Sequence, residues 1–200
     1  MSTAHAGKLF QEGYELAFES KKRTKPWDKI FALWHTAAVS GNIRAQFYLG
    51  TCYDFGNGVK RDISQAFKWY LTAAEKGKME AQYNIGFFYR EGEFVPLDYK
   101  KAVYWYSLAA KQGDIEAQRD LGFCYFYGQG VRRDHSKAIH WYKKAAKKGD
   151  EKAMYNLGLC FEFGDGVRKS IRWATYYYMK ASKLKHKMAA DKLKHFKFAA

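Results

Sequence analysis

The stretch AQRDLGFCYFYGQGVRRDHSKAIHWYKKAAKKG, Ala117 to Gly149, recurs in related form at a fixed spacing along the 200-residue chain. Alanines at positions 45, 81, 117 and 153 are each 36 residues apart, as are glycines at positions 50, 86, 122 and 158. Matches at one spacing over this many positions indicate an internal repeat. The 36-residue period therefore decides the fold.

Each repeat contains a glycine-rich loop, seen as FGNGV from Phe55, YGQGV from Tyr127 and FGDGV from Phe163. A phosphate-binding loop would be needed once, whereas this loop recurs with the repeat, so we interpret it as a turn. Glycine at both positions suits a left-handed backbone after a helix. In the second repeat Phe94 replaces the second glycine, which predicts a turn of different shape there.

Two helices per repeat follow from the pattern of apolar and capping residues. The second helix carries apolar residues at spacings of three and four, which place them on one helical face. Tyrosines at positions 53, 89 and 125 and tryptophans at 69, 105 and 141 keep the repeat spacing and are predicted core residues. Good N-cap residues precede the helices; for the second helices they are Asp62, Asp98, Asp134 and Ser170, and for the first helices Asn42, Asp114 and Asp150.

The consensus AxxxLGxxYxxGxGVxxDxxxAxxWYxxAAxxG resembles the Sel-one-like repeat (SLR), a relative of the tetratricopeptide repeat. The resemblance implies an all-α fold, a right-handed α/α superhelical solenoid of 36-residue helix-turn-helix repeats with degenerate capping helices. It also implies a non-enzymatic scaffold or adaptor for protein complexes. The predicted division is a degenerate capping helix pair with a polar linker (1–44), four repeats (45–182; 45–80, 81–116, 117–152 and 153–182), and a basic terminal helix (183–200).

The resemblance also implies which residues line the concave groove of the solenoid. Twenty positions follow from the helix orientation of the tetratricopeptide family, and nine of them are aromatic. Aromatic residues and arginine are favoured at interface hot spots, so we expect a partner protein or peptide to bind there; the alternative is that these rings pack on one another. The candidate partner-binding residues are Phe47, Phe55, Tyr83, Phe87, Arg90, Arg119, Phe123, Phe126, Tyr127, Tyr155 and Phe163.

Positive charge is concentrated in the C-terminal half of this basic protein. The net charge is +15, and residues 117–200 hold 19 Lys and Arg against seven Asp and Glu. A surplus of this size suits a partner of acidic character, and nucleic acid or an anionic membrane surface remains an alternative without a supporting motif. A solvated face is the plainer interpretation. The candidate basic patch is Lys143, Lys144, Lys147, Lys148, Lys183, Lys185, Lys187, Lys192 and Lys194.

Nothing in the sequence has the spacing of a catalytic, cofactor or metal site. The three cysteines, 52, 124 and 160, occupy equivalent repeat positions on separate helices, too far apart for a disulfide, and the six histidines are scattered. We therefore predict no enzyme activity, no cofactor and no metal. No signal peptide or membrane-spanning segment is evident, which predicts a cytoplasmic protein. A further alternative is an immunity-type protein that neutralises a toxin.

Overall fold

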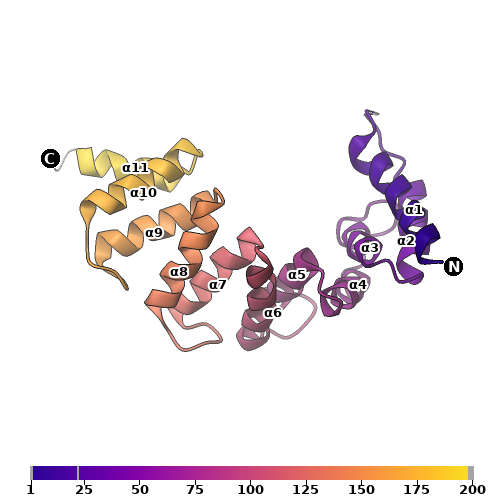
Figure 1. The fold of residues 1–200 in the computed structure, drawn as a ribbon, viewed down its shortest axis with the longest axis horizontal. Helices are drawn as coiled ribbons and strands as arrows, with labels where there is room; N and C mark the ends of the chain where they lie inside the picture. Colours follow the sequence, from indigo (N-terminus) through magenta and orange to yellow (C-terminus); the bar gives the residue numbers. More distant parts are fainter. Residues whose placement is uncertain (1, 22, 198–200) are drawn as a thin grey trace. The chain divides into compact units, whose positions relative to one another are not determined.

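The computed structural model describes residues 2–21 and 23–197, and within them all regular structure is helical (Figure 1). The chain forms two compact units that divide between Leu97 and Asp98. The helices of the first unit are α1 (Thr3–Tyr14), a π-helical segment (Glu15–Glu19), α2 (Trp27–Val39), α3 (Ile43–Phe55), α4 (Ile63–Glu75) and α5 (Met79–Glu91). Those of the second are α6 (Tyr99–Gln112), α7 (Ile115–Tyr127), α8 (His135–Lys147), α9 (Glu151–Phe163), α10 (Ile171–Lys183) and α11 (Lys187–Lys197).

The predicted all-α repeat architecture is confirmed, and so are its capping residues. The side chain of each predicted N-cap accepts a hydrogen bond from a backbone N–H in the first turn of its helix. In α8, for example, Asp134 Oδ1 accepts from the N–H of Lys137 at 2.9 Å. The same arrangement begins α3, α4, α6, α7, α9 and α10.

The repeated glycine of each first helix makes room for a tyrosine of the second helix. A Cβ atom on Gly50 would lie 2.6 Å from Cδ1 of Tyr70, and one on Gly122 would lie 2.7 Å from the same atom of Tyr142. These tyrosines are fully buried, whereas the tryptophan that precedes each of them is half-buried. Residues 53, 89 and 125 are half-buried as well, so the centre of each repeat is one residue away from the predicted tryptophan.

The glycine-rich loops turn through left-handed backbone at both positions. Gly128 and Gly130 have φ of 74° and 70°, and a Cβ on Gly130 would overlap the carbonyl oxygen of Tyr99 at the start of α6. In the second repeat Phe94 has φ of 64°, and Gly92 before it has 69°. Phe94 therefore keeps the positive φ of the glycine that it replaces, although L-residues rarely take this conformation, and this turn also contains a hydrogen bond from the Val95 N–H to the Glu93 carbonyl at 2.7 Å.

The chain departs from the repeat pattern at Lys185, near its C-terminus. Lys185 occupies the position of Gly149 one repeat earlier and, like that glycine, has positive φ, at 67° against 97°. Because the chain turns here, α11 begins at Lys187, four residues after the predicted start of the terminal helix at 183. Residues 198–200 of the predicted terminal segment lie outside the described residues.

Each unit has a buried core of its own. In the first unit this core joins residues of α1, α2 and α3, including Phe10, Trp34 and Leu49. In the second unit it joins α8, α9, α10 and α11, with Leu157 and Tyr178 fully buried. None of the described helices combines the length and apolar character needed to span a bilayer.

Candidate functional site

The first helices of the repeats carry all the predicted partner-binding residues, and none of these residues is fully buried. Exposure varies widely among them. Phe55 at the end of α3 is 71% exposed and Phe163 at the end of α9 is 62% exposed, whereas Phe47 and Phe87 are half-buried. The predicted set divides between the two units, with one group on α3 and α5 and the other on α7 and α9.

In the first unit the candidate aromatic residues pack against neighbouring side chains. The Phe47 ring centroid lies 5.7 Å from that of Tyr70, and Lys78 Nζ lies 5.6 Å from the Phe47 ring. The guanidinium of Arg90 lies 5.1 Å from the ring of Phe87. Tyr83 and Arg90 both belong to α5 and are half-buried.

In the second unit three candidate aromatic residues of α7 meet in one cluster. The ring centroids of Phe123 and Tyr127 are 4.5 Å apart, those of Phe126 and Tyr127 are 5.0 Å apart, and His135 stacks on Phe126 at 4.6 Å. Tyr127 is nevertheless 59% exposed and Phe123 is 37% exposed. Large aromatic rings are thus held in place by one another while they still face solvent.

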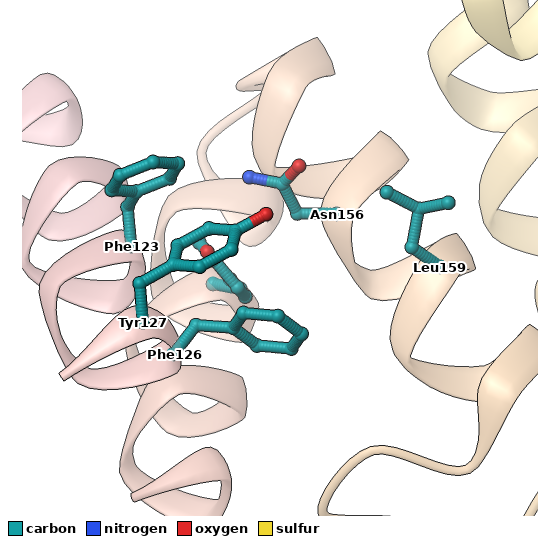
Figure 2. A pocket seen from close by; sticks show the side chains of 6 residues that line it. Phe123, Phe126, Tyr127, Asn156 and Leu159 are labelled. Atoms are coloured by element: carbon teal, nitrogen blue, oxygen red, sulfur yellow. The ribbon is translucent and has the colours of Figure 1, made fainter. Parts of the chain in front are cut away.

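This cluster forms one wall of a small pocket, here called the α7–α9 pocket, with a volume of about 40 Å³. Figure 2 shows Phe123, Phe126 and Tyr127 on one helix and Asn156 and Leu159 on the facing helix. The sixth lining residue is Tyr142 of α8. The pocket therefore has mainly apolar walls, and its polar groups are the hydroxyls of Tyr127 and Tyr142 and the carboxamide of Asn156.

Tyr142 and Asn156 were not among the predicted site residues, yet their polar groups distinguish this pocket. In the first repeat the buried Tyr70 donates a hydrogen bond to Asp54 Oδ2 at 3.3 Å. Phe126 occupies the position of Asp54 two repeats later, and among the described residues neither the Tyr142 hydroxyl nor the Asn156 carboxamide has a hydrogen-bond partner. Comparing the repeats position by position would have shown this exchange of an acidic residue for phenylalanine.

Two other candidates in the second unit are engaged in internal contacts. Arg119 Nε pairs with Asp120 at 2.9 Å and its Nη1 with Asp150 at 3.0 Å, and all three side chains are largely buried. Because Asp150 also caps α9, Arg119 joins α7 to the start of that helix. Tyr155 stacks on His186 at 4.6 Å. These residues are not among those that line the α7–α9 pocket.

The predicted basic residues are spread over several elements of the second unit. Lys143, Lys144 and Lys147 are exposed on α8. Lys148 Nζ donates to the carbonyl of Gly113 at 2.7 Å, and Lys192 Nζ pairs with Glu162 at 2.8 Å. The remaining members of the set lie at the end of α10, in the following turn or on α11, and they are Lys183, Lys185, Lys187 and Lys194.

The cysteines are free, buried thiols. Burial raises the pKa of Cys52 and of Cys160 to about 12, so both keep their protons at neutral pH. Among the described residues, no group of three or more His, Cys, Asp or Glu side chains is arranged to hold a metal ion.

The repeat motif and the helix pairs agree with a known family of proteins. The Sel1 repeat model matches residues 43–78, 80–114, 115–150 and 151–186, well over half of the chain. The chain belongs to the Sel1 repeat family. This confirms the resemblance indicated by the consensus. Sel1 repeat proteins generally mediate protein–protein interactions, and the family is generally non-enzymatic.

Solved structures of Sel1 repeat proteins have the same fold. A protective antigen present in uropathogenic Escherichia coli strains is 34% identical over 94% of this chain, with a TM-score of 0.88. The match covers 40% of that protein's chain, so the present chain spans about two fifths of its length. A Sel1 repeat protein from Oxalobacter formigenes is 31% identical, with coverage of 94% of this chain and 76% of that one and a TM-score of 0.85.

A more distant likeness concerns an immunity protein from Pseudomonas aeruginosa. It is 24% identical over 92% of this chain and 68% of its own, with a TM-score of 0.57, and the likeness shows the shared fold alone. No curated protein matches the sequence.

Proposed function

We propose that this Sel1 repeat chain binds a partner protein through the α7–α9 pocket of its second unit. The observation that carries the proposal is the hydroxyl of Tyr142, a residue that lines the pocket and whose hydroxyl has no hydrogen-bond partner among the described residues. A donor that lines a pocket and has no internal partner is a reason to expect a ligand, because a bound acceptor would pair with it.

Comparison with the fourth repeat explains why this hydroxyl has no internal partner. Tyr178, one repeat after Tyr142, donates to Glu162, and Glu162 is also held by Lys192. Phe126 stands one repeat before Glu162 and offers no acceptor. A partner that supplies an acceptor would pair with the Tyr142 hydroxyl on binding, and such a hydrogen bond contributes about 0.5–1.5 kcal/mol.

The chemistry of the pocket defines the side chain that it would accept. Burial raises the pKa of Tyr142, so its hydroxyl stays protonated at neutral pH and acts as a donor. The Asn156 carboxamide supplies both a donor and an acceptor. A volume of about 40 Å³ suits a short side chain. We infer that the partner inserts a short side chain with a hydrogen-bond acceptor, while exposed Tyr127 and Phe123 cover the residues around it.

The decisive variant is Tyr142→Phe, which removes only the hydroxyl oxygen. We expect it to leave thermal stability nearly unchanged, because the hydroxyl has no internal hydrogen bond to lose. Partner proteins would be identified by affinity purification and mass spectrometry with the wild type, then purified and titrated against each variant by calorimetry. The proposal expects affinity to fall by about 0.5–1.5 kcal/mol in Tyr142→Phe and also in Asn156→Ala.

Tyr104→Phe serves as the matched control, since Tyr104 is an exposed tyrosine of α6 outside the pocket. It removes the same atom and should not alter binding. If the purified partner bound wild type, Tyr142→Phe and the double variant Phe123→Ala/Tyr127→Ala with equal affinity, the α7–α9 pocket would not be the binding site.

A further inference from the structure

A second, larger hollow lies in the same unit and shares no lining residue with the α7–α9 pocket. This α8–α10 pocket has a volume of about 310 Å³. Its lining comes from three helices. The residues are Lys143, Ala146 and Lys147 of α8, Met154 of α9, and Tyr176, Tyr177 and Lys180 of α10.

The rim of the α8–α10 pocket is positively charged and lacks internal counterions. Neither His135–Lys147 nor Ile171–Lys183 contains an aspartate or glutamate. Among the described residues, Lys143, Lys147 and Lys180 form no ion pair, and Glu151, one turn before Met154 on α9, forms none with them. Three uncompensated ammonium groups around one hollow favour an anionic ligand.

The interior of the α8–α10 pocket is apolar. Met154 and Ala146 are both buried, at 4% and 7% exposed. Tyr177 is half-buried and carries the Phe161 ring stacked on it, with centroids 5.7 Å apart and an interplanar angle of 11°. Methionine adapts its shape to different apolar groups. The ligand that fits both parts has an apolar group between negative charges.

A protein segment fits this combination better than nucleic acid or a membrane. Unspecific nucleic-acid binding uses free aromatic faces for base stacking, but Phe161 covers a face of Tyr177, and Lys180 Nζ lies 5.4 Å from the ring centroid of Tyr176. Binding in a membrane interface uses apolar side chains that enter the lipid, whereas Met154 and Ala146 in this pocket are buried.

We propose that the α8–α10 pocket is a second protein-binding site that accepts an acidic segment of a partner. An apolar side chain of that segment enters the hollow against Met154. Carboxylates before and after it in the sequence pair with Lys143 and Lys147 on one side and with Lys180 on the other. This site is independent of the α7–α9 pocket, and either could exist without the other.

The test uses the full chain and a fluorescein-labelled peptide in which one phenylalanine is flanked by two glutamates on each side. Fluorescence anisotropy would measure its affinity for the wild type and for Lys143→Glu/Lys180→Glu. We expect the double variant to bind about tenfold more weakly or worse, because like charges then face the carboxylates. Circular dichroism would verify that these exposed substitutions leave the helices intact.

A matched control separates this pocket from the general attraction of a chain with net charge +15. Lys100→Glu/Lys111→Glu changes two exposed lysines of α6 and the same total charge. It should weaken binding less than about threefold, because neither lysine lines the pocket and salt screens charges outside it. Equal losses in the two double variants would overturn the proposal.

Two further probes test the apolar and anionic parts of the ligand. A peptide with glycine in place of phenylalanine should bind markedly more weakly, and one with glutamine in place of glutamate should not bind. If the glycine peptide bound as well as the phenylalanine peptide, the hollow would have no role and the proposal would fail. The proposal would also fail if an oligothymidylate or phosphatidylserine vesicles bound in a Lys143- and Lys180-dependent way while the peptide did not.

Discussion

Phe94 shows that the glycine-rich loops can have two separate requirements at the second glycine position. One is a positive φ, and the other is space for a close backbone contact. Gly130 has positive φ and also lies so close to the Tyr99 carbonyl that a Cβ atom would overlap it. Phe94 keeps the positive φ and carries a large side chain that packs 5.5 Å from the ring of Phe67. Left-handed backbone is therefore common to both loops, and the loop of Gly130 adds a close approach to α6.

This comparison leads to opposite expectations for two substitutions. Gly130→Ala should lower the free energy of unfolding by about 2 kcal/mol or more, from positive φ together with overlap against backbone. Phe94→Gly should be more stable than Phe94→Ala by about 1 kcal/mol, because both lose the ring contact and only glycine relieves the φ. Urea unfolding of the wild type and the three variants would measure both differences.

Phosphate should not raise the melting temperature of the wild type, and a saturable rise would contradict the assignment of this loop as a turn.

The buried thiols give a second expectation at this scale. With a pKa of about 12, Cys52 and Cys160 remain protonated at mildly alkaline pH, and the thiolate is the reactive form. Iodoacetamide should label neither residue in the folded protein, and should label both after denaturation in guanidinium chloride. Rapid labelling of either in the native state, followed by mass spectrometry, would show that the helix carrying it opens easily.

At the scale of helices, sequence reasoning succeeded where the determining interaction is local. N-caps such as Asp134 act on the N–H groups within the next three residues, so the sequence alone identifies them. Packing between helices is not local. The tryptophan at 141 and Tyr142 are adjacent, and only the structure shows that Gly122 admits the tyrosine ring. The exchange of Asp54 for Phe126 is visible in the aligned repeats, but only the structure shows that residues at this position pair with the buried tyrosine.

Acid should weaken the cap of α8 in a predictable direction. The N–H of Lys137 donates to Asp134 and holds its pKa below the usual range. A depressed carboxyl pKa contributes stability that is present above the unfolded pKa, about 4, and is lost as pH falls through the folded value. Asp134→Asn should therefore be less stable than the wild type at neutral pH, with a difference in melting temperature that shrinks below about pH 4.

Ser170 provides a control for this pH dependence, because its hydroxyl caps α10 without a titrating charge. Ser170→Ala should cost about 1 kcal/mol at every pH of the series. A wild type-to-Asp134→Asn difference that stayed constant in acid would show that the charge of Asp134 does not contribute to the cap.

At the scale of the whole molecule, the two units each have their own core, and the repeat period does not mark their division at Leu97. The repeat period is uniform across that point, and the local signal is the loop before it, where Phe94 replaces a glycine and Pro96 is one of the two prolines of the chain. In repeat proteins each repeat contacts only its neighbours, and stability is close to a sum of local terms. A substitution that destabilises one core should therefore lower stability mainly in the unit that contains it.

Leu49 and Leu157 allow this to be tested with equivalent substitutions, since both are fully buried and lie three repeats apart. Leu49 belongs to the core formed by α1–α3, and Leu157 to that formed by α8–α11. Replacing either with alanine leaves a cavity and should cost about 2–5 kcal/mol locally. Hydrogen exchange followed by mass spectrometry should show faster exchange in α2 and α3 for Leu49→Ala, and in α8, α9 and α10 for Leu157→Ala, because exchange reports the opening of each cooperative region separately. If both variants raised exchange by the same factor in every helix, the chain would unfold as one cooperative body and the local description would be wrong.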